Sequence, residues 1–268
     1  MKKKLIIANW KMSPQSLAEA VEILDSVDEY LGSLSETKKF SLVFCPSFVF
    51  TEEVGKILKT SHLEHQAELG AQDISIDDNV ALTGEVSGPM LRQLGVRYVI
   101  IGHSERRWKL GESDKVVNKK LKAVLNNEMI PIVCIGERER NFSVEDGPAS
   151  GWKNFLKEQI LNTFADLDPS EISRCIIAYE PVWAISTTPG ARPDTPESAL
   201  ESTSLIKNIS LPNGYSLVAN RYLYGGSVTS ANAREFLQDD GFDGVLIGGA
   251  SVDSEEFIKI LSATAGLK

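Results

Sequence analysis

Short apolar runs rich in β-branched residues alternate along the chain with longer stretches in which apolar residues recur at helical spacing. Short runs of near-continuous apolarity are typical of parallel strands that are buried on both faces. Strands of this kind separated by helices indicate an α/β fold. The predicted strands are Leu5–Asn9, Leu42–Cys45, Glu64–Gln72, Tyr98–Gly102, Ile130–Ile135, Cys175–Glu180, Leu217–Tyr224 and Gly244–Gly248.

Helical spacing is clearest in three of the intervening stretches. The positions that share a predicted helix face are Leu17, Val21 and Leu24 in the first, Val117, Leu121 and Val124 in the second, and Phe155, Gln159 and Phe164 in the third. Ser13-Pro14 and Thr195-Pro196 predict helix starts, because proline is favoured in the first helical turn. Glu197 adds a carboxylate beside the positive end of the second of these helices.

Polar residues and glycines gather just after several of the predicted strands. These segments are Asn9-Trp10-Lys11, Gly102-His103-Ser104-Glu105, Glu180-Pro181, Tyr224-Gly225-Gly226-Ser227 and Gly248-Gly249. In a closed barrel the carboxyl ends of all strands converge on one face, where active sites are built. A doubly wound sheet brings such distant segments together less readily, so the distribution favours a (β/α)₈ barrel. Because no Pro-, Gly- or Ser-rich linker divides the sequence, we expect one domain over residues 1–268.

The composition is that of a folded globular protein, with 42% hydrophobic and 24% charged residues. The 28 basic and 37 acidic residues leave a net charge of −9, which argues against non-specific nucleic-acid binding. An anionic ligand would therefore need a local positive site.

Cysteine usage and the amino-terminal segment bear on the compartment. Cys45, Cys134 and Cys175 lie in apolar runs without metal-ligand spacing, and we expect buried thiols in a reducing environment. The apolar run Leu5–Ala8 is too short for an export signal, and no segment approaches the ~18 apolar residues of a membrane span. The sequence predicts a cytoplasmic protein with no membrane partner.

Two strand ends carry groups suited to acid–base chemistry. Glu180 ends an apolar strand, where partial loss of water would raise its basicity enough to abstract a carbon-bound proton. A solvated carboxylate is the alternative. His103 follows another apolar strand and could be an acid–base group, a structural histidine or a metal ligand. A metal is disfavoured because no second His or Cys stands at ligand spacing, and His62 and His65 are expected to face solvent.

Positive charge and glycines point to an anionic ligand. Lys11, just beyond the first strand, could draw a phosphorylated substrate to the barrel mouth, although a surface lysine is the alternative. The glycine pairs Gly225-Gly226 and Gly248-Gly249 follow the last two strands, where barrels often bind phosphate through backbone N–H groups. Either pair alone could be a tight turn.

Four other conspicuous residues are interpreted structurally. Glu85 and Arg106 lie in charged turns and are expected to form structural ion pairs. Trp10 and Trp183 are expected to be packing residues rather than ligand platforms.

Taken in order, these segments resemble the triosephosphate isomerase family over essentially the whole chain. The matching stretches are Asn9-Trp10-Lys11-Met12, Gly70-Ala71-Gln72, Thr83-Gly84-Glu85, Gly102-His103-Ser104-Glu105-Arg106-Arg107, Cys134-Ile135-Gly136-Glu137, Ala178-Tyr179-Glu180-Pro181-Val182-Trp183-Ala184-Ile185, Tyr224-Gly225-Gly226-Ser227-Val228 and Gly248-Gly249-Ala250-Ser251. The resemblance implies a (β/α)₈ barrel that interconverts dihydroxyacetone phosphate and D-glyceraldehyde 3-phosphate through an enediolate, with neither cofactor nor metal.

The resemblance also implies roles for individual residues. Glu180 matches the family's base and His103 the neutral imidazole that polarises the substrate carbonyl. Lys11 and Asn9 match the groups at the substrate oxygens, and Glu105 matches a second carboxylate near the site. The residues that match the phosphate cradle are Ser186, Ser227, Gly248 and Gly249.

The segment after Glu180 departs from the family pattern. The family usually has Gly-Thr-Gly-Lys before a Thr-Pro-Glu helix start, whereas residues 186–194 read STTPGARPD and are about three residues longer. Ser186 stands where a glycine normally meets phosphate, and two prolines are expected to stiffen the segment. This difference keeps open an isomerase of a related sugar phosphate, such as erythrulose phosphate. A non-catalytic phosphate-binding barrel is the remaining alternative.

Two further segments are compared with the family. The region from Gln72 to Val86 matches the loop that enters a neighbouring subunit, which implies a homodimer with Met12, Gln72 and Thr83 near the contact. The stretch from Arg138 to Gly151 lacks the family's usual charged lead and is expected to be a surface loop.

Overall fold

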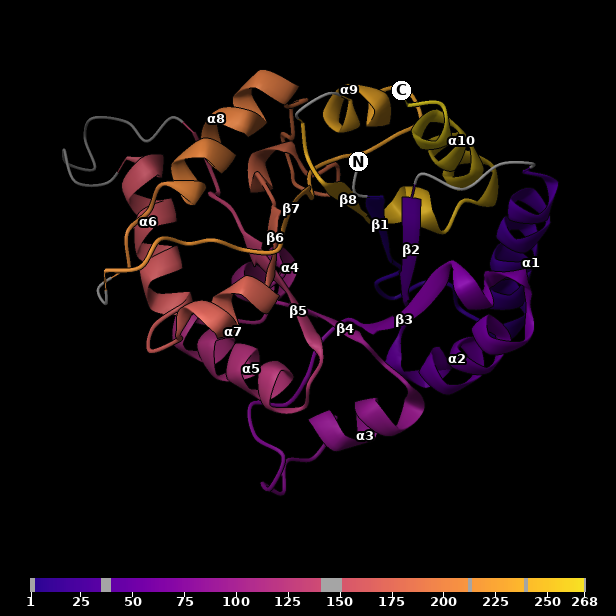
Figure 1. Ribbon diagram of the computed structural model, residues 1–268, viewed down its shortest axis with the longest axis horizontal. Coiled ribbons are helices and arrows are strands. Elements are labelled where there is room, and N and C mark those ends of the chain that lie inside the picture. Colours follow the sequence, from indigo (N-terminus) through magenta and orange to yellow (C-terminus); the bar gives the residue numbers. More distant parts are fainter. Residues whose placement is uncertain (1–2, 35–39, 141–150, 212–213, 239–240, 268) are drawn as a thin grey trace.

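The eight strands form a closed, all-parallel barrel in sequential order, as the sequence predicts (Figure 1). The computed structural model describes residues 3–34, 40–140, 151–211, 214–238 and 241–267, with only the backbone described at residue 62. The strands are β1 (Lys4–Asn9), β2 (Phe40–Cys45), β3 (Ala67–Ala71), β4 (Tyr98–Ile101), β5 (Ile130–Ile135), β6 (Ile176–Tyr179), β7 (Arg221–Tyr224) and β8 (Gly244–Ile247).

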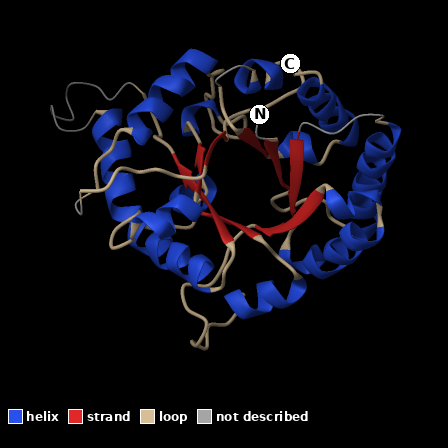
Figure 2. Ribbon diagram, in the orientation of Figure 1, coloured by secondary structure: helices blue, strands red, loops and turns tan. Residues whose placement is uncertain are grey.

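Helices surround the barrel and cover its outer face (Figure 2). They are α1 (Leu17–Ser33), α2 (Thr51–Thr60), α3 (Gly88–Leu94), α4 (Ser104–Lys109), α5 (Asp114–Asn126), α6 (Trp152–Thr163), α7 (Pro169–Arg174), α8 (Pro196–Lys207), α9 (Ala233–Leu237) and α10 (Ser254–Ala265). Short 3₁₀ turns are η1 (Phe48–Phe50), η2 (His62–His65), η4 (Val182–Ala184) and η5 (Gly249–Ser251). None of the helices in the described part of the chain has the length and apolarity needed to cross a membrane.

The near-continuous apolarity of the strands has a direct structural cause. Along β1, Leu5 and Ile7 point into the barrel, whereas Ile6 and Ala8 pack against the surrounding helices. Both faces of each strand are therefore removed from water, and polar side chains are excluded until the strand ends. The three cysteines are buried and unpaired, as expected.

Helix α1 differs from its prediction in both start and orientation. Ser16, not Ser13-Pro14, is its amino-terminal cap, because the Ser16 hydroxyl accepts a hydrogen bond from the backbone N–H of Glu19. Leu17 is 39% exposed, and the buried face runs through Ala20, Ile23, Leu24, Val27 and Leu31 instead. The predicted face had the right period, but a second apolar set on the same helix packs more deeply.

Strands β3 and β7 begin well inside their predicted ranges, and β4, β6 and β8 differ from theirs only at the terminal residues. Strand β3 begins at Ala67, because Glu64 and His65 belong to the 3₁₀ turn η2. Strand β7 begins at Arg221, and the preceding Leu217, although buried, lies outside the ladder. An apolar residue that packs in a loop leaves the same sequence signal as one in a strand.

The other helix predictions are largely confirmed. Val117, Leu121 and Val124 are all buried on α5. Gln159 and Phe164 are buried on and just after α6, whereas Phe155 is half-buried. Thr195 caps α8 through its hydroxyl, with Pro196 in the first turn as predicted.

Candidate active site

Eight of the nine predicted site residues line one pocket of about 260 Å³ at the carboxyl ends of the strands. They come from strands and loops that are far apart in the sequence, and barrel closure brings them to one rim. These residues are Asn9, Lys11, His103, Glu180, Ser186, Ser227, Gly248 and Gly249. The ninth, Glu105, is not part of the lining but pairs with Lys11.

Glu180 and His103 form the centre of this pocket. Glu180 follows β6 directly and is only 2% exposed, and its Oε1 lies 3.1 Å from His103 Nε2. Its other oxygen, Oε2, accepts a hydrogen bond from the backbone N–H of Ser104 at 3.0 Å. Ser104 opens α4, so this N–H is one of the donors that a helix leaves unpaired at its start. The Ser104 N–H thus holds one carboxylate oxygen, whereas Oε1, buried beside His103, has no hydrogen-bond partner among the described residues.

The hydrogen bonds of His103 assign its tautomer. His103 caps α4, and its Nδ1 accepts a hydrogen bond from the backbone N–H of Glu105 at 3.3 Å. A ring nitrogen that accepts carries no proton, so the proton of the neutral imidazole resides on Nε2. That nitrogen faces Glu180 and the pocket, and it can therefore donate to a ligand oxygen.

Lys11 is held in an uncommon backbone conformation. Its φ of 55° lies in the left-handed region, which costs a non-glycine residue of order 1–3 kcal/mol. Its N–H donates to Asn9 Oδ1 at 3.2 Å. Its carbonyl accepts from Gln72 Nε2 and from Ser47 Oγ, each at 2.8 Å. These bonds fix the backbone that carries the ammonium.

Glu105 lies behind the ammonium of Lys11 rather than in the pocket. The Lys11 Nζ–Glu105 Oε1 distance is 3.0 Å, and Glu105 Oε2 lies 3.6 Å from His103 Nδ1. Partial burial raises the pKa of Glu105. The charge and the hydrogen bond of the Lys11 ammonium, with a smaller contribution from Lys109, more than offset this effect and hold the pKa of Glu105 below its ordinary value. The carboxylate therefore stays ionised and orients Lys11.

Two glycines leave room for the catalytic geometry. A Cβ added at Gly225 would lie 2.8 Å from Glu180 Cγ, and one at Gly136 would lie 1.8 Å from the Glu180 carbonyl oxygen. Larger residues at these positions would displace Glu180. The glycine after β7 therefore serves the carboxylate as well as the predicted phosphate cradle.

Residues 186–194 are here called the active-site loop. Its first two residues, Ser186 and Thr187, line the pocket together with the segment after β7. The backbone N–H of Ser186 donates to Ser227 Oγ at 2.8 Å. Ser227 is held in turn by Asn232, whose Nδ2 donates to the Ser227 carbonyl at 3.0 Å. The Ser186 N–H is thus at the predicted phosphate end of the pocket, where it contacts a hydroxyl.

Glu137 supports the base of the active-site loop, a role that the sequence did not predict. Its side chain is fully buried, and Oε1 accepts from the Tyr179 hydroxyl at 2.8 Å and from Trp183 Nε1 at 3.0 Å. Burial raises the pKa of Glu137, and the bonds from Trp183 and Tyr179 partly offset this. Trp183 therefore packs as predicted and also anchors the start of the loop. Glu137 could have been singled out as a site residue from the Cys134-Ile135-Gly136-Glu137 motif at the end of β5.

The structural ion pairs expected in the charged turns are only half confirmed. Arg106 pairs with Asp73 at 2.8 Å and with Glu112 at 2.7 Å. Glu85 is exposed, and within the described ranges it forms no ion pair. Trp10 is buried, as predicted for a packing residue. His65 is exposed as expected, and the side chain of His62 lies outside the described part.

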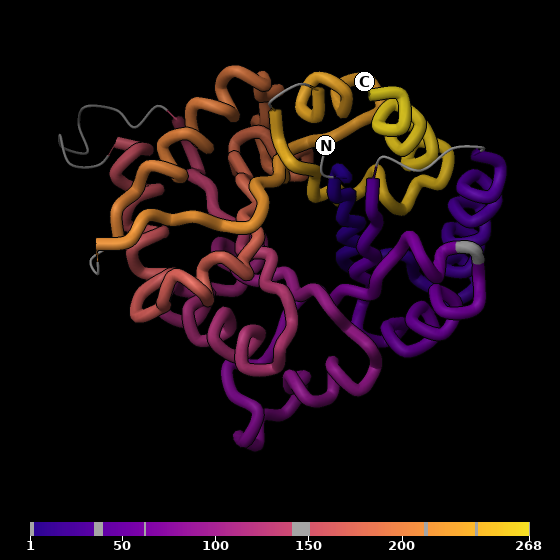
Figure 3. The backbone as a smooth tube through the Cα atoms, in the orientation of Figure 1, coloured from indigo at the N-terminus to yellow at the C-terminus, as the bar shows by residue number. Residues whose placement is uncertain are grey.

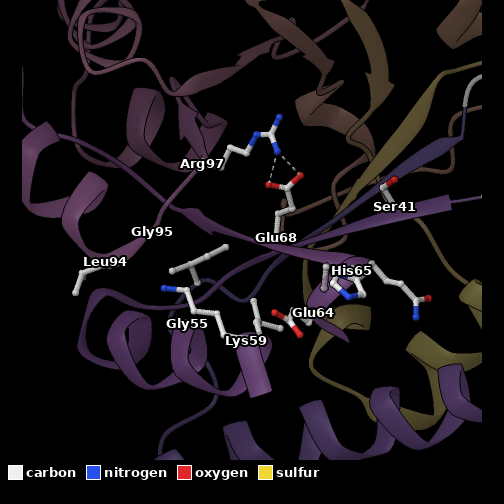
Figure 4. Close-up of a pocket in the computed structure, with 13 residues that line it drawn as sticks. Ser41, Gly55, Lys59, Glu64, His65, Glu68, Leu94, Gly95 and Arg97 are labelled. Carbon is white, nitrogen blue, oxygen red and sulfur yellow. Dashed lines mark hydrogen bonds and ion pairs between the residues drawn. The ribbon is translucent and has the colours of Figure 1, made fainter. Parts of the chain in front are cut away.

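A second pocket lies at the opposite end of the barrel, beside the amino ends of β2 and β3 (Figure 4). Arg97 and Glu68 form an ion pair at its edge, with Arg97 Nη1 donating to both carboxylate oxygens at 2.9 and 3.0 Å. Its lining includes none of the predicted site residues.

The closed barrel and the residues at its rim define a (β/α)₈-barrel enzyme built for acid–base chemistry. A buried carboxylate, an imidazole and an ammonium group share one pocket, and the ammonium suits an anionic ligand.

Comparison with known proteins agrees with this class. The family model described as Triosephosphate isomerase matches residues 4–264. The triosephosphate isomerase of Endomicrobium trichonymphae is 39% identical, with 97% of this chain and 98% of the relative covered. That of Alkaliphilus oremlandii (strain OhILAs) is 37% identical, with 98% and 100% covered. A crystal structure of triosephosphate isomerase from Bartonella henselae superposes with a TM-score of 0.77 at 29% identity, covering 97% of this chain and 98% of that one. The chain belongs to the triosephosphate isomerase family, a family of isomerases.

Proposed function

We propose that the pocket interconverts dihydroxyacetone phosphate and D-glyceraldehyde 3-phosphate, with Glu180 as the base and His103 as the electrophile. The observation that carries this proposal is the 3.1 Å approach of His103 Nε2 to Glu180 Oε1 inside a pocket that also contains Lys11. A proton-abstracting carboxylate and a proton-donating imidazole are thus directed at the same small volume. Family membership over nearly the whole chain supports the same reaction.

Each step of the reaction uses one of these groups. Glu180 removes a proton from the carbon beside the substrate carbonyl, and the released electron pair forms the C=C bond of an enediolate. His103 Nε2–H, the Lys11 ammonium and the Asn9 amide stabilise the negative oxygen that results. The hydroxyl proton on the first carbon then moves to the oxygen on the second carbon, with His103 Nε2 as the carrier between the two oxygens. Glu180, now protonated, returns its proton to the second carbon as the electron pair of the first oxygen forms the new carbonyl, which completes the isomerisation. The substrate must first displace the contacts of Glu180 with Ser104 and His103.

The phosphate group is proposed to bind at the other end of the pocket. Backbone N–H groups near Gly248 and Gly249, together with Ser227, would accept it, with Lys11 supplying positive charge. Ser186 would add its N–H after giving up the bond to Ser227 Oγ. Glu105 has no place at the substrate in this scheme and acts by orienting Lys11. No feature of the described pocket favours the four-carbon sugar phosphate or a non-catalytic role.

Replacement of Glu180 by aspartate tests the proposed function. Glu180→Asp withdraws the carboxylate by one methylene, and turnover of dihydroxyacetone phosphate should fall by orders of magnitude while binding of 2-phosphoglycolate persists. Unchanged turnover would remove Glu180 from the role of base.

We also propose a homodimer joined through the region from Gln72 to Val86. This segment protrudes from the ring of helices between β3 and α3 (Figure 1, Figure 3). A partner would cover the exposed apolar side chains of Val80 and Leu82 in this segment. It would also cover the exposed side chain of Met12, which is predicted to lie near the contact. Sedimentation should give twice the monomer mass, and a fully active monomer would contradict the proposal.

The compartment and the domain extent are proposed on simpler grounds. Free, buried Cys45, Cys134 and Cys175 support a cytoplasmic, reducing location. We propose that residues 1–268 form a single barrel domain, in which the expected surface loop of residues 138–151 falls mostly outside the described part. Cell fractionation and limited proteolysis test these two proposals.

A further inference from the structure

The guanidinium of Arg140 contacts several elements around the active-site loop. Its side chain is only 14% exposed. Its Nε donates to Glu137 Oε1 at 3.2 Å, and its Nη2 donates to the Ser198 carbonyl at 2.7 Å and to Ser202 Oγ at 2.5 Å. The guanidinium carbon also lies 4.3 Å from the ring centroid of Trp152 on α6. A planar group with fixed donor directions can satisfy all of these partners at once.

These contacts connect the two ends of the active-site loop. Trp183, in η4, belongs to the end that follows Glu180, and Glu137, just after β5, accepts a hydrogen bond from its indole N–H. Ser198 belongs to the other end, because it lies in the first turn of α8, which starts directly after the loop. Arg140 is hydrogen-bonded to both groups. Its position therefore sets the spacing of the loop ends.

A second arginine, Arg192, joins the later part of the active-site loop to its start. The backbone N–H of Arg192 donates to the Trp183 carbonyl at 3.1 Å. Both arginines also approach the indole, with guanidinium carbons 5.1 Å (Arg192) and 5.7 Å (Arg140) from the ring centroid. Such cation–π contacts add to the hold on Trp183. The hydrogen bond from Arg192 to Trp183 thus brings the later part of the loop back to the residue that Arg140 supports through Glu137.

We propose that Arg140 is a positioning residue for the isomerisation, which presents the Ser186 N–H to the substrate phosphate by fixing both ends of the active-site loop. This inference rests on the proposed function and deepens it. Arg140 lies outside the pocket lining, so its effect must pass through Glu137, Trp183 and the loop. Loss of phosphate contacts weakens the bound substrate and the transition state alike, and therefore appears in KM rather than in kcat.

Substitution of Arg140 by methionine tests the proposal by kinetics and by titration with 2-phosphoglycolate. Arg140→Met should raise KM for dihydroxyacetone phosphate, and the Kd for 2-phosphoglycolate, about tenfold with little change in kcat. Arg140→Lys keeps the charge but not the planar fork, and it should restore only part of the affinity. A purely structural role would instead lower the amount of folded enzyme and leave both constants of the folded fraction unchanged. That outcome would overturn the proposal.

A neighbouring arginine provides the matched control. Arg138 lies two positions earlier, and its guanidinium carbon lies 5.5 Å from the ring centroid of Trp108 on α4. Within the described residues it forms no hydrogen bond to Glu137, Trp183 or α8. Arg138→Met removes the same charge from the same segment and should leave KM and Kd at the wild-type values. An equal rise in KM for both variants would show an effect of net charge and contradict a specific role for Arg140.

A milder variant keeps the proposal decidable if Arg140→Met does not fold. Ser202→Ala removes one of the contacts of Arg140 to α8 and leaves its bond to the Ser198 carbonyl, so it should shift Kd in the same direction by a smaller factor. An unchanged Kd in folded Ser202→Ala would then count against the link between the loop ends. Inactive wild-type enzyme would overturn the proposed function, whereas the 2-phosphoglycolate titration would still decide the role of Arg140.

Discussion

Lys11 Nζ and Glu105 Oε1 lie 3.0 Å apart, which joins the segment after β1 to the first turn of α4 at the rim of the barrel. The pair explains how one ammonium group can be held in position in a protein with a net charge of −9. The carboxylate orients the lysine from outside the pocket, and the side of the ammonium toward the pocket remains available to a ligand.

Removal of the ammonium should weaken the transition state most. Lys11→Met should lower kcat/KM for dihydroxyacetone phosphate by about 10³-fold, because it removes a preorganised positive charge from the enediolate oxygen and the phosphate. Steady-state kinetics at low ionic strength measures this effect. Lys109 contacts the same Glu105 carboxylate at 3.8 Å but is exposed, so Lys109→Met is the matched control and should be near wild type. Equal losses in both variants would contradict a specific role for Lys11.

The lowered pKa of Glu105 predicts a contribution to stability that disappears in acid. A carboxyl group with a lower pKa in the folded than in the unfolded state stabilises the fold above its unfolded pKa. This contribution is lost as the pH falls through the unfolded and then the folded pKa. Urea unfolding between pH 6 and about pH 3 should therefore show a steeper loss of stability for wild type than for Glu105→Gln. Parallel curves would contradict the stabilising ion pair.

The packing of Gly225 against Glu180 predicts a loss of catalysis when a side chain is added at this glycine. In Gly225→Ala the new methyl would lie 2.8 Å from Glu180 Cγ, so the carboxylate must move. We expect kcat to fall about 10²-fold, because the base leaves its reactive position. Gly32→Ala is the control, since no atom lies within 4 Å of the added methyl in α1. It should leave kcat unchanged, and a normal kcat in Gly225→Ala would show that Glu180 tolerates the displacement.

The bond from Ser186 to Ser227 predicts how the phosphate end responds to loss of a hydroxyl. Ser227→Ala removes the acceptor of the Ser186 N–H and one polar group of the proposed phosphate site. The inhibition constant of inorganic phosphate should rise about tenfold. Ser230→Ala is a fitting control, because the Ser230 hydroxyl donates to Glu256. Equal inhibition of wild type and Ser227→Ala would place the phosphate elsewhere.

The barrel fold could be predicted because burial of both strand faces requires short, continuous apolar segments in the sequence. Strands such as β1 alternate residues between two buried faces, and this requirement leaves an apolar run that can be recognised without coordinates. The first and last residues of helices and strands are harder to predict, because neighbouring residues are similarly suited to cap a helix or to be buried. Ser16 caps α1 in preference to the equally plausible Ser13-Pro14, and Leu217 is buried in a loop rather than in β7.

The candidate site was predicted as a set of residues but not as a network. Polar groups at strand ends stand out against apolar runs, which is why Glu180 and His103 could be found. The groups that hold the site were not predicted: the backbone N–H of Ser104 binds Glu180, and the carboxylate of Glu137 binds Trp183. A backbone N–H donor cannot be recognised from the sequence. A glutamate just after a strand does not reveal from the sequence whether it is buried or exposed.

In the proposed reaction, Glu180 carries the proton between two carbons of the substrate. Exchange of the carbon-bound hydrogen of dihydroxyacetone phosphate with D₂O, followed by NMR, tests this step without requiring the complete turnover. Wild type should incorporate one deuterium at the reacting carbon, and Glu180→Gln, which retains the shape but loses the base, should incorporate none above the uncatalysed rate. Deuterium incorporation by Glu180→Gln at the wild-type rate would contradict the account.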